Sequence, residues 1–153
     1  MWPRGRHSFR VVSEEEPLFR ELDHTADIAI EVVADSPAEL FRRAGLALHS
    51  FLVEADGIES REERRLDVES TGWADLLHDW LARLLRDFLV QGFVAREIAV
   101  DEISDRRIAS RISGETLDHD RHQFIGEIKA VTYHELVVEE RDGRWRAHLI
   151  FDV

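Results

Sequence analysis

The sequence predicts an α+β fold, a two-layer domain in which two helices pack on a mostly antiparallel sheet. Two segments repeat apolar residues with the period of an α-helix, whereas others show the alternation or the short apolar runs of β-strands. The last of the expected strands follow one another without a helix between them, and such consecutive strands pair antiparallel. With 153 residues, 44% of them hydrophobic, the chain is long enough for one such domain.

The first part of the chain predicts an extension followed by two strands. Residues 1–16 lack apolar periodicity and end in an acidic run before Pro17. We therefore expect a flexible N-terminal extension and a single domain over residues 17–153. A short strand is expected over residues 18–22, and the alternation of apolar residues over 28–34 predicts a second one.

The first helix has clear terminal signals in the sequence. Ser36 is expected to cap its N-terminus, with Pro37 in the first helical position and Glu39 completing a capping box. An apolar stripe then continues with helical spacing, so the helix should end near Val53.

A second, longer helix is expected over residues 72–90, with Gly92 as its stop. Its polar side carries the pair His78 and Asp79. Together with His49, this pair could indicate a metal-dependent phosphohydrolase, but that class needs an all-helical domain. We therefore interpret the pair as part of the solvated face of an amphipathic helix.

The remaining ordered segments are strand-like. Asp142-Gly143 is typical of a two-residue hairpin turn. Such a turn would place Val138 opposite Ala147 and, further along the same pair of strands, His134 opposite Phe151. The strands expected outside the first two cover residues 64–69, 94–100, 107–113, 125–139 and 145–151.

Composition excludes several classes of function. The net charge of −12 disfavours direct high-affinity binding of nucleic acid, because phosphate contacts need clustered Lys and Arg. The absence of cysteine excludes disulfides, thiolate metal sites and a cysteine nucleophile. The sequence contains no glycine-rich phosphate loop, no nucleophile elbow and no apolar run that could cross a bilayer. We expect a soluble cytoplasmic protein without a membrane partner.

One lysine stands out against this composition. Of the 20 basic residues, 19 are Arg and only Lys129 is Lys. A chain that uses Arg wherever a positive charge suffices retains Lys where a compact ammonium is needed that a planar guanidinium cannot replace. Chance survival of a surface lysine is the alternative interpretation.

Two places in the sequence present carboxylates that could bind a cation. Asp23 and Asp27 lie with His24 in the turn between the first two strands, and Asp152 precedes the α-carboxylate of Val153. Hard carboxylate oxygens suit Ca²⁺ or Mg²⁺ better than Zn²⁺. Turn chemistry alone could also explain the first group, and fraying the second.

A third polar group, from Asp118 to His122, also contains possible metal ligands. Adjacent side chains cannot converge on one ion without donors from elsewhere in the fold. We therefore interpret this segment as a solvated polar turn.

Three ordered motifs resemble the archease family. They are the segment from Asp23 to Ile28, the segment Glu-Ile-Lys-Ala-Val-Thr-Tyr-His that ends at His134, and the terminal Ile-Phe-Asp-Val. The resemblance covers about residues 19–153. The apolar pattern of the second helix and His122 ahead of the Lys129 segment are also similar to the family.

This resemblance implies a function that composition could not supply. Archeases are small acidic cofactors of the RtcB-type RNA ligase, which joins RNA ends in tRNA splicing and RNA repair with GTP and a divalent metal. The resemblance implies that the protein promotes guanylylation and multiple turnover of the ligase and is not itself an enzyme. It further implies a Ca²⁺-type cation on Asp27, Asp152 and Val153, and a role in ligase activation for Lys129.

Two other functions remain open from the residues alone. A metal-dependent phosphohydrolase could use Asp27, Asp152 and His24 around its cation, and His24 or His134 is the nearby candidate for a general base. A general protein-binding, chaperone-like module is the third possibility. Asp23, His24 and His134 are thus expected at most to support the site.

Overall fold

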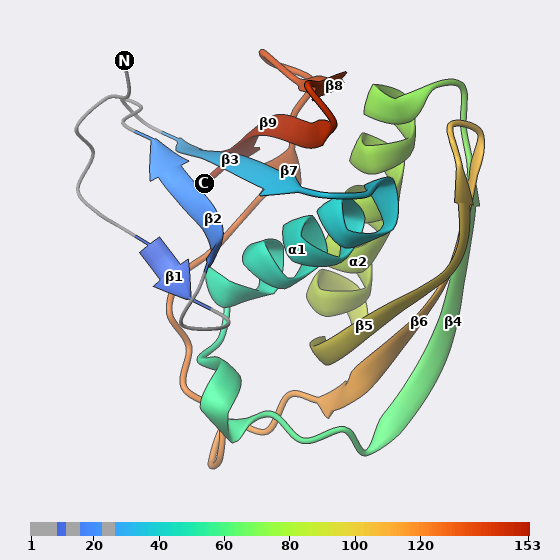
Figure 1. Ribbon diagram of the computed structural model, residues 1–153. Coiled ribbons are helices and arrows are strands. Elements are labelled where there is room, and N and C mark those ends of the chain that lie inside the picture. Colours follow the sequence, from blue (N-terminus) through green and yellow to red (C-terminus); the bar gives the residue numbers. More distant parts are fainter. Residues whose placement is uncertain (1–8, 12–15, 23–26) are drawn as a thin grey trace.

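The structure is a computed structural model in which residues 9–11, 16–22 and 27–153 are described (Figure 1). It confirms the α+β class, with two helices packed on antiparallel strands. The helices are α1 (Pro37–Ser50) and α2 (Trp73–Gln91), and a short 3₁₀ turn covers Ala55–Gly57. The strands are β1 (Phe9–Val11), β2 (Pro17–Leu22), β3 (Ile28–Ala34), β4 (Glu62–Glu69), β5 (Phe93–Ser104), β6 (Arg107–Thr116), β7 (Ala130–Val131), β8 (Val137–Arg141) and β9 (Arg144–Asp152).

The strands divide between two sheets, whereas the sequence suggested one. Six strands form the larger sheet in the order β1-β2-β3-β9-β7, with β8 also paired to β9, and the smaller sheet has the order β4-β6-β5. Both helices contact both sheets and lie between them (Figure 1). The reason is the wide apolar face of α2, which buries more than one stripe of side chains and so needs partners on two sides. Its buried residues are Leu76, Leu77, Trp80, Leu81, Leu84 and Leu85.

Helix α1 begins as predicted. The Ser36 hydroxyl accepts a hydrogen bond from the Glu39 amide at 3.1 Å, and Pro37 occupies the first turn. The second half of the expected capping box is wrong, because the Glu39 carboxylate binds the guanidinium groups of Arg42 and Arg43. The helix also ends at Ser50, earlier than expected, although the apolar residues that follow are buried. Because the apolar residues after Ser50 are buried without being helical, the apolar pattern predicted the end of the helix too late.

Helix α2 agrees with the sequence at both ends. It begins directly after Gly72 and ends at Gly92, which adopts the left-handed conformation with φ of 70°. The Gly92 amide satisfies a carbonyl of the last turn, that of Phe88. None of the helices in the described ranges is long and apolar enough to cross a membrane.

The strand expected over residues 125–139 is wrong. Only β7 and β8 form within it, and the chain from 117 to 129 runs as a connection without strand structure. Between the two strands the chain turns, and Glu135 there has a left-handed φ of 52°. Apolar residues on either side of this turn suggested continuity, and both strands do run in the same direction along β9, but the turn leaves residues 132–136 out of the pairing.

The hairpin between β8 and β9 follows the prediction only near its turn. Arg141 pairs with Arg144 around the two residues of Asp142-Gly143, whose φ angles are both positive, as the mirror-image turn requires. Val138 lies opposite Ala147, as expected. The pairing of His134 with Phe151 is wrong, because Val131 occupies that position. The turn between β7 and β8 therefore shifts the register by the three residues that separate 131 from 134.

The N-terminal region is described only in part. Residues 9–11 form β1, which pairs with β2, so this piece of the expected flexible extension is a strand. Glu16 is ion-paired with Arg43 and Arg144, each at 3.0 Å. The rest of residues 1–16, like the four residues from Asp23 to Ala26, lies outside the described ranges.

Candidate functional site at the end of strand β9

Strand β9 collects residues from distant parts of the sequence at its carboxyl end. β3 pairs with it on one side, and β7 pairs with it on the other. Since both neighbours are antiparallel to β9, each of them begins where β9 ends (Figure 1). The residues that open β3 and β7 therefore meet the last residues of the chain.

The register places two of the predicted carboxylates across from each other. Ile28 pairs with Phe151, so one further step along the same register sets Asp27 opposite Asp152. Residues directly opposite in an antiparallel pair have Cβ atoms about 4.5–5.5 Å apart. Asp27 is half-buried and Asp152 is exposed, so both side chains can reach solvent at this end of the sheet.

Lys129 reaches the same strand end from the other side. Ala130 pairs with Asp152, and the Lys129 amide donates a hydrogen bond to the Asp152 carbonyl oxygen at 2.7 Å. The side chain of Lys129 is exposed, and among the described residues it has no ion-pair partner.

The donor chemistry of this strand end fits a hard cation. Asp27 and Asp152 provide carboxylate oxygens, the ligands that Ca²⁺ and Mg²⁺ prefer. Within the described part of the chain, no group of three or more His, Asp or Glu side chains gathers closely enough to hold a metal. The pair therefore needs further oxygen donors, for which Val153, 40% exposed, is the adjacent candidate.

The remaining predicted site residues are not brought together by the described structure. Asp23 and His24 lie outside the described ranges. His134 is in the turn after β7, where it is exposed and its Nε2 lies 3.2 Å from a Glu135 carboxylate oxygen. The role of a general base at the strand end, considered for His134, has no support in this position.

Comparison with known proteins decides the family. The model of the archease protein family matches residues 19–153. The archease of Methanopyrus kandleri is 36% identical over 138 residues, which cover 88% of this chain and 99% of that protein. The archease of Pyrococcus abyssi is 35% identical over 135 residues, with 86% and 95% of the two chains covered. The chain belongs to the archease family.

Solved structures agree with this assignment. The solution structure of protein 1598 from Methanobacterium thermoautotrophicum has a TM-score of 0.76 and 29% identity, and the match covers 88% of this archease and 98% of that chain. The crystal structure of an archease from Thermotoga maritima, described as a possible chaperone, has a TM-score of 0.59 and 23% identity over 97% and 100% of the chains. The second likeness shows the shared fold alone.

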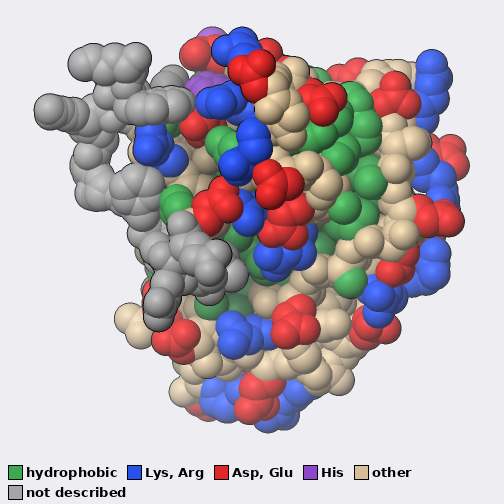
Figure 2. Space-filling view, viewed as in Figure 1, with side chains coloured by type: hydrophobic (Ala, Val, Ile, Leu, Met, Phe, Trp, Pro, Cys, Tyr) green, Lys and Arg blue, Asp and Glu red, His purple; other side chains and the backbone are tan. Residues whose placement is uncertain are grey.

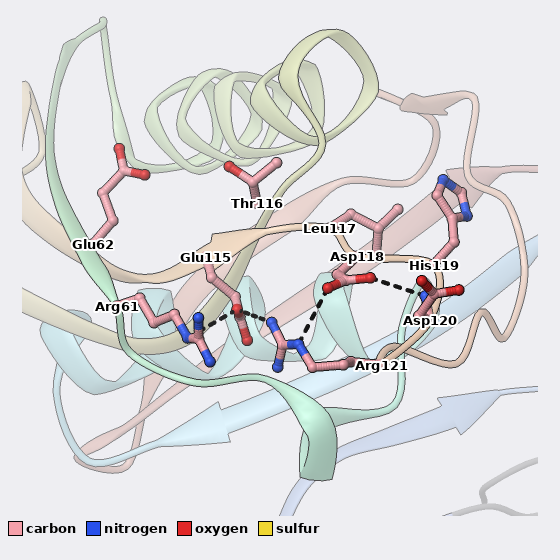
Figure 3. A pocket seen from close by; sticks show the side chains of 9 residues that line it. All are labelled: Arg61, Glu62, Glu115, Thr116, Leu117, Asp118, His119, Asp120 and Arg121. Carbon is pink, nitrogen blue, oxygen red and sulfur yellow. Dashed lines mark hydrogen bonds and ion pairs between the residues drawn. The ribbon is translucent and has the colours of Figure 1, made fainter.

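A separate charged cluster lies at the end of β6 in this archease. The carboxylate of Glu115 is buried and accepts hydrogen bonds from the Glu59 amide at 2.6 Å, from the His122 ring at 3.0 Å and from the Arg121 guanidinium. Figure 3 shows Glu115 between Arg61 and Arg121, with Asp118 on the far side of Arg121. They line an open cavity of about 660 Å³.

These contacts explain both the charge state of Glu115 and the form of the loop. Burial alone would raise the pKa of the Glu115 carboxyl, but the hydrogen bonds from Arg121, Glu59 and His122 lower it to about 2. His122 is itself buried, and its Nδ1 accepts from the Asp118 amide at 2.8 Å. The interpretation of the whole segment as a solvated turn is therefore wrong for His122. The arginines of the cavity are neutralised by these carboxylates, which indicates a structural role.

His78, in the pair with Asp79, is also less exposed than expected. The His78 side chain is only 14% exposed, and its ring contacts β7 and Tyr133. The interpretation as a solvated helix face is therefore wrong for His78, whereas the Asp79 side chain is 40% exposed. The sequence could not reveal this, because the contact joins residues about 53 positions apart.

Proposed function

We propose that this archease activates an RtcB-type RNA ligase, promoting its guanylylation and multiple turnover in tRNA splicing or RNA repair, without joining RNA itself. Family membership supports the proposal. The observation that carries it is the convergence of Asp27, Asp152 and Lys129 on one strand end, where two carboxylates and one ammonium are presented to solvent.

A divalent cation, Ca²⁺ or another, is part of this proposal. Asp27 and Asp152 would hold it together with the α-carboxylate of Val153, and Asp23 and His24 could support them. When bound, the cation supplies positive charge that offsets the repulsion between neighbouring carboxylates and holds the strand end in one arrangement. Asp152 lies on β9, and Asp27 directly precedes β3, which pairs with β9 from Ile28 onward.

Lys129 is proposed to contact the ligase. A lysine ammonium is a compact charge with three donors, and it can approach a phosphate or carboxylate where the planar guanidinium would clash. The hydrogen bond from its amide to Asp152 fixes the backbone from which the side chain extends. The position of the amine is therefore coupled to the strand end that carries the carboxylates.

The distribution of charge supports a protein partner over RNA. The chain has a net charge of −12. Figure 2 shows Lys and Arg side chains interspersed with Asp and Glu on the face in view, without a continuous basic area. Direct binding to a nucleic acid backbone requires such an area, whereas an acidic protein can dock on a basic partner.

The first experiment measures ligase guanylylation with Lys129→Arg at saturating concentration. We expect impaired activation although the charge is preserved. Arg86→Lys, an exchange of the same two residue types at an exposed position of α2, is the matched control and should activate normally. Full activation by Lys129→Arg would contradict the role of the compact ammonium. Robust metal-dependent phosphatase turnover by the isolated protein would instead favour the phosphohydrolase.

The second experiment tests the cation by calorimetry with Ca²⁺. Asp27→Ala should fold and lose Ca²⁺ binding, whereas Asp56→Ala, which removes an exposed carboxylate from the 3₁₀ turn, should bind as the unaltered protein does. Unchanged Ca²⁺ affinity in Asp27→Ala would show that the site lies elsewhere. Since a ligand of the folded state alone stabilises it by mass action, Ca²⁺ should also raise the melting temperature of the unaltered protein.

A further inference from the structure

His78 connects helix α2 to strand β7. Its Nε2 lies 2.9 Å from the carbonyl oxygen of Val131, and its Nδ1 lies 3.0 Å from a carboxylate oxygen of Asp79. The His78 side chain is 14% exposed, whereas that of Asp79 is 40% exposed. One imidazole thus joins the helix to the two-residue strand that follows Lys129 in the sequence.

Both partners of the ring are acceptors. A backbone carbonyl has no hydrogen to give, and an ionised carboxylate has none either. Asp79 stays ionised, because burial raises its pKa but the hydrogen bonds from His78 and Ser70 outweigh this and lower it. The Ser70 hydroxyl donates to the other Asp79 oxygen at 2.9 Å. The imidazole can therefore satisfy both contacts only when both of its nitrogens carry a proton.

Tyr133 adds a second contact between the same elements. Its ring stacks on the His78 ring, with centroids 3.7 Å apart and planes at 16°, and its hydroxyl lies 3.4 Å from Asp79. An aromatic face attracts a cation placed over it, which again favours the doubly protonated ring. Two titratable groups thus contact His78, Asp79 on its own helix and Tyr133 from the segment after β7.

The contacts of His78 and Tyr133 add to a weak attachment of β7 to β9. β7 has two residues, and few main-chain bonds join this part of the chain to β9. Among them are those from the Lys129 amide to Asp152 and from the Thr132 amide to Ile150, at 2.7 and 3.1 Å. His78 binds the chain between these two amides, at Val131. A short strand opens easily without such lateral support.

We propose that His78, in its doubly protonated form, is a positioning residue that holds β7 against β9 and so fixes Lys129 at the strand end. The inference rests on the proposed function for its effect on the ligase, but the restraint on β7 does not. Removal of the imidazole takes away both contacts, so β7 should loosen and Lys129 should activate the ligase less well.

The test combines two measurements on the isolated protein with one on the ligase. Long-range ¹H–¹⁵N NMR at about pH 6 should show protons on both His78 nitrogens. Amide exchange, corrected for its intrinsic pH dependence, should show protection of Lys129 and Thr132 falling about fivefold in His78→Gln, as loss of one hydrogen bond gives. His148→Gln is the matched control, since its ring has one acceptor, the Glu135 carbonyl, and it should leave this protection unchanged.

Guanylylation is then measured with each protein. We expect activation by His78→Gln to be lower than activation by the unaltered protein, and activation by His148→Gln to be unchanged. A single proton on the His78 ring at about pH 6, or amide protection unaffected by His78→Gln, overturns the inference. If the unaltered protein fails to activate the ligase while the NMR and exchange results hold, the proposed function fails and the restraint on β7 stands.

Discussion

Replacing Glu115 by Gln should produce a loss of stability that depends on pH in a defined way. The carboxylate is 4% exposed and is held by the Glu59 amide, the His122 ring and Arg121. Burial opposes its ionisation, but these contacts outweigh burial and lower the pKa from an ordinary value of 4.5 to about 2. Since one pKa unit corresponds to about 1.36 kcal/mol, the ionised side chain stabilises the folded state by about 3 kcal/mol at neutral pH.

The direction of the pH effect follows from the lowered pKa. The contribution is fully present above the unfolded value of 4.5 and is lost as the pH falls toward the folded value of about 2. The amide of the Glu115→Gln variant does not titrate, so the difference in unfolding free energy between the two proteins should be about 3 kcal/mol at neutral pH and shrink steadily in acid. For a chain of this size, that corresponds to a melting temperature lower by roughly 10 °C.

Urea unfolding of both proteins at a series of pH values measures this difference directly. Other carboxylates titrate in both proteins and cancel. Glu62→Gln is the control, because Glu62 is 46% exposed and its ion pair with Arg64 should contribute less than about 1 kcal/mol. A difference that stays constant from neutral to acid pH would refute the assignment of the stabilisation to the charge of Glu115. Equal unfolding free energies of the two proteins at neutral pH would refute the expected stabilisation of about 3 kcal/mol.

Two further predictions concern the core and the chain end. Ser110→Ala should destabilise the fold by about 1–3 kcal/mol. The Ser110 hydroxyl accepts a hydrogen bond from the buried Trp80 indole N–H at 3.0 Å and donates one to the Leu66 carbonyl, and the variant loses both. An unchanged midpoint of denaturant unfolding would contradict this. Residues added after Val153 should weaken Ca²⁺ binding and ligase activation, because they convert a carboxylate into a neutral carbonyl, whereas an N-terminal tag should do neither. Equal Ca²⁺ affinity of the two tagged proteins in calorimetry would eliminate Val153 as a charged ligand, and a lower melting temperature without metal would instead indicate fraying of β9.

The features that the sequence predicted correctly are local ones. The cap at Ser36, the stop at Gly92 and the turn at Asp142-Gly143 each depend on a few consecutive residues whose backbone preferences act without help from the rest of the chain. The same is true of the pairing of Val138 with Ala147, which a two-residue turn dictates over short distances. The motifs that resemble the archease family likewise identified the family before any contact was known, and the comparisons confirmed it.

The site itself was decided by pairing between distant segments. Extending the hairpin register along the chain puts His134 beside Phe151 and leaves Lys129 beyond the end of β9. The turn after β7 shifts the pairing with β9 by three residues, so Lys129 lies at the end of β9 instead of beyond it. A change of register repositions every following side chain, so no local pattern could have predicted it.

Burial of polar side chains was the other matter that tertiary structure decided. By sequence, His78 belongs to the polar side of a helix and His122 to a polar turn, yet both rings are enclosed by partners from other elements. A polar residue can be buried when the fold supplies its hydrogen-bond partners, and those partners are distant in the sequence. The sequence by itself determined the two helices, the N-cap of α1, the stop of α2 and the last hairpin turn, because these depend on neighbouring residues. The packing of α2 against β7 and of the connecting loop against β6 determined which polar groups meet.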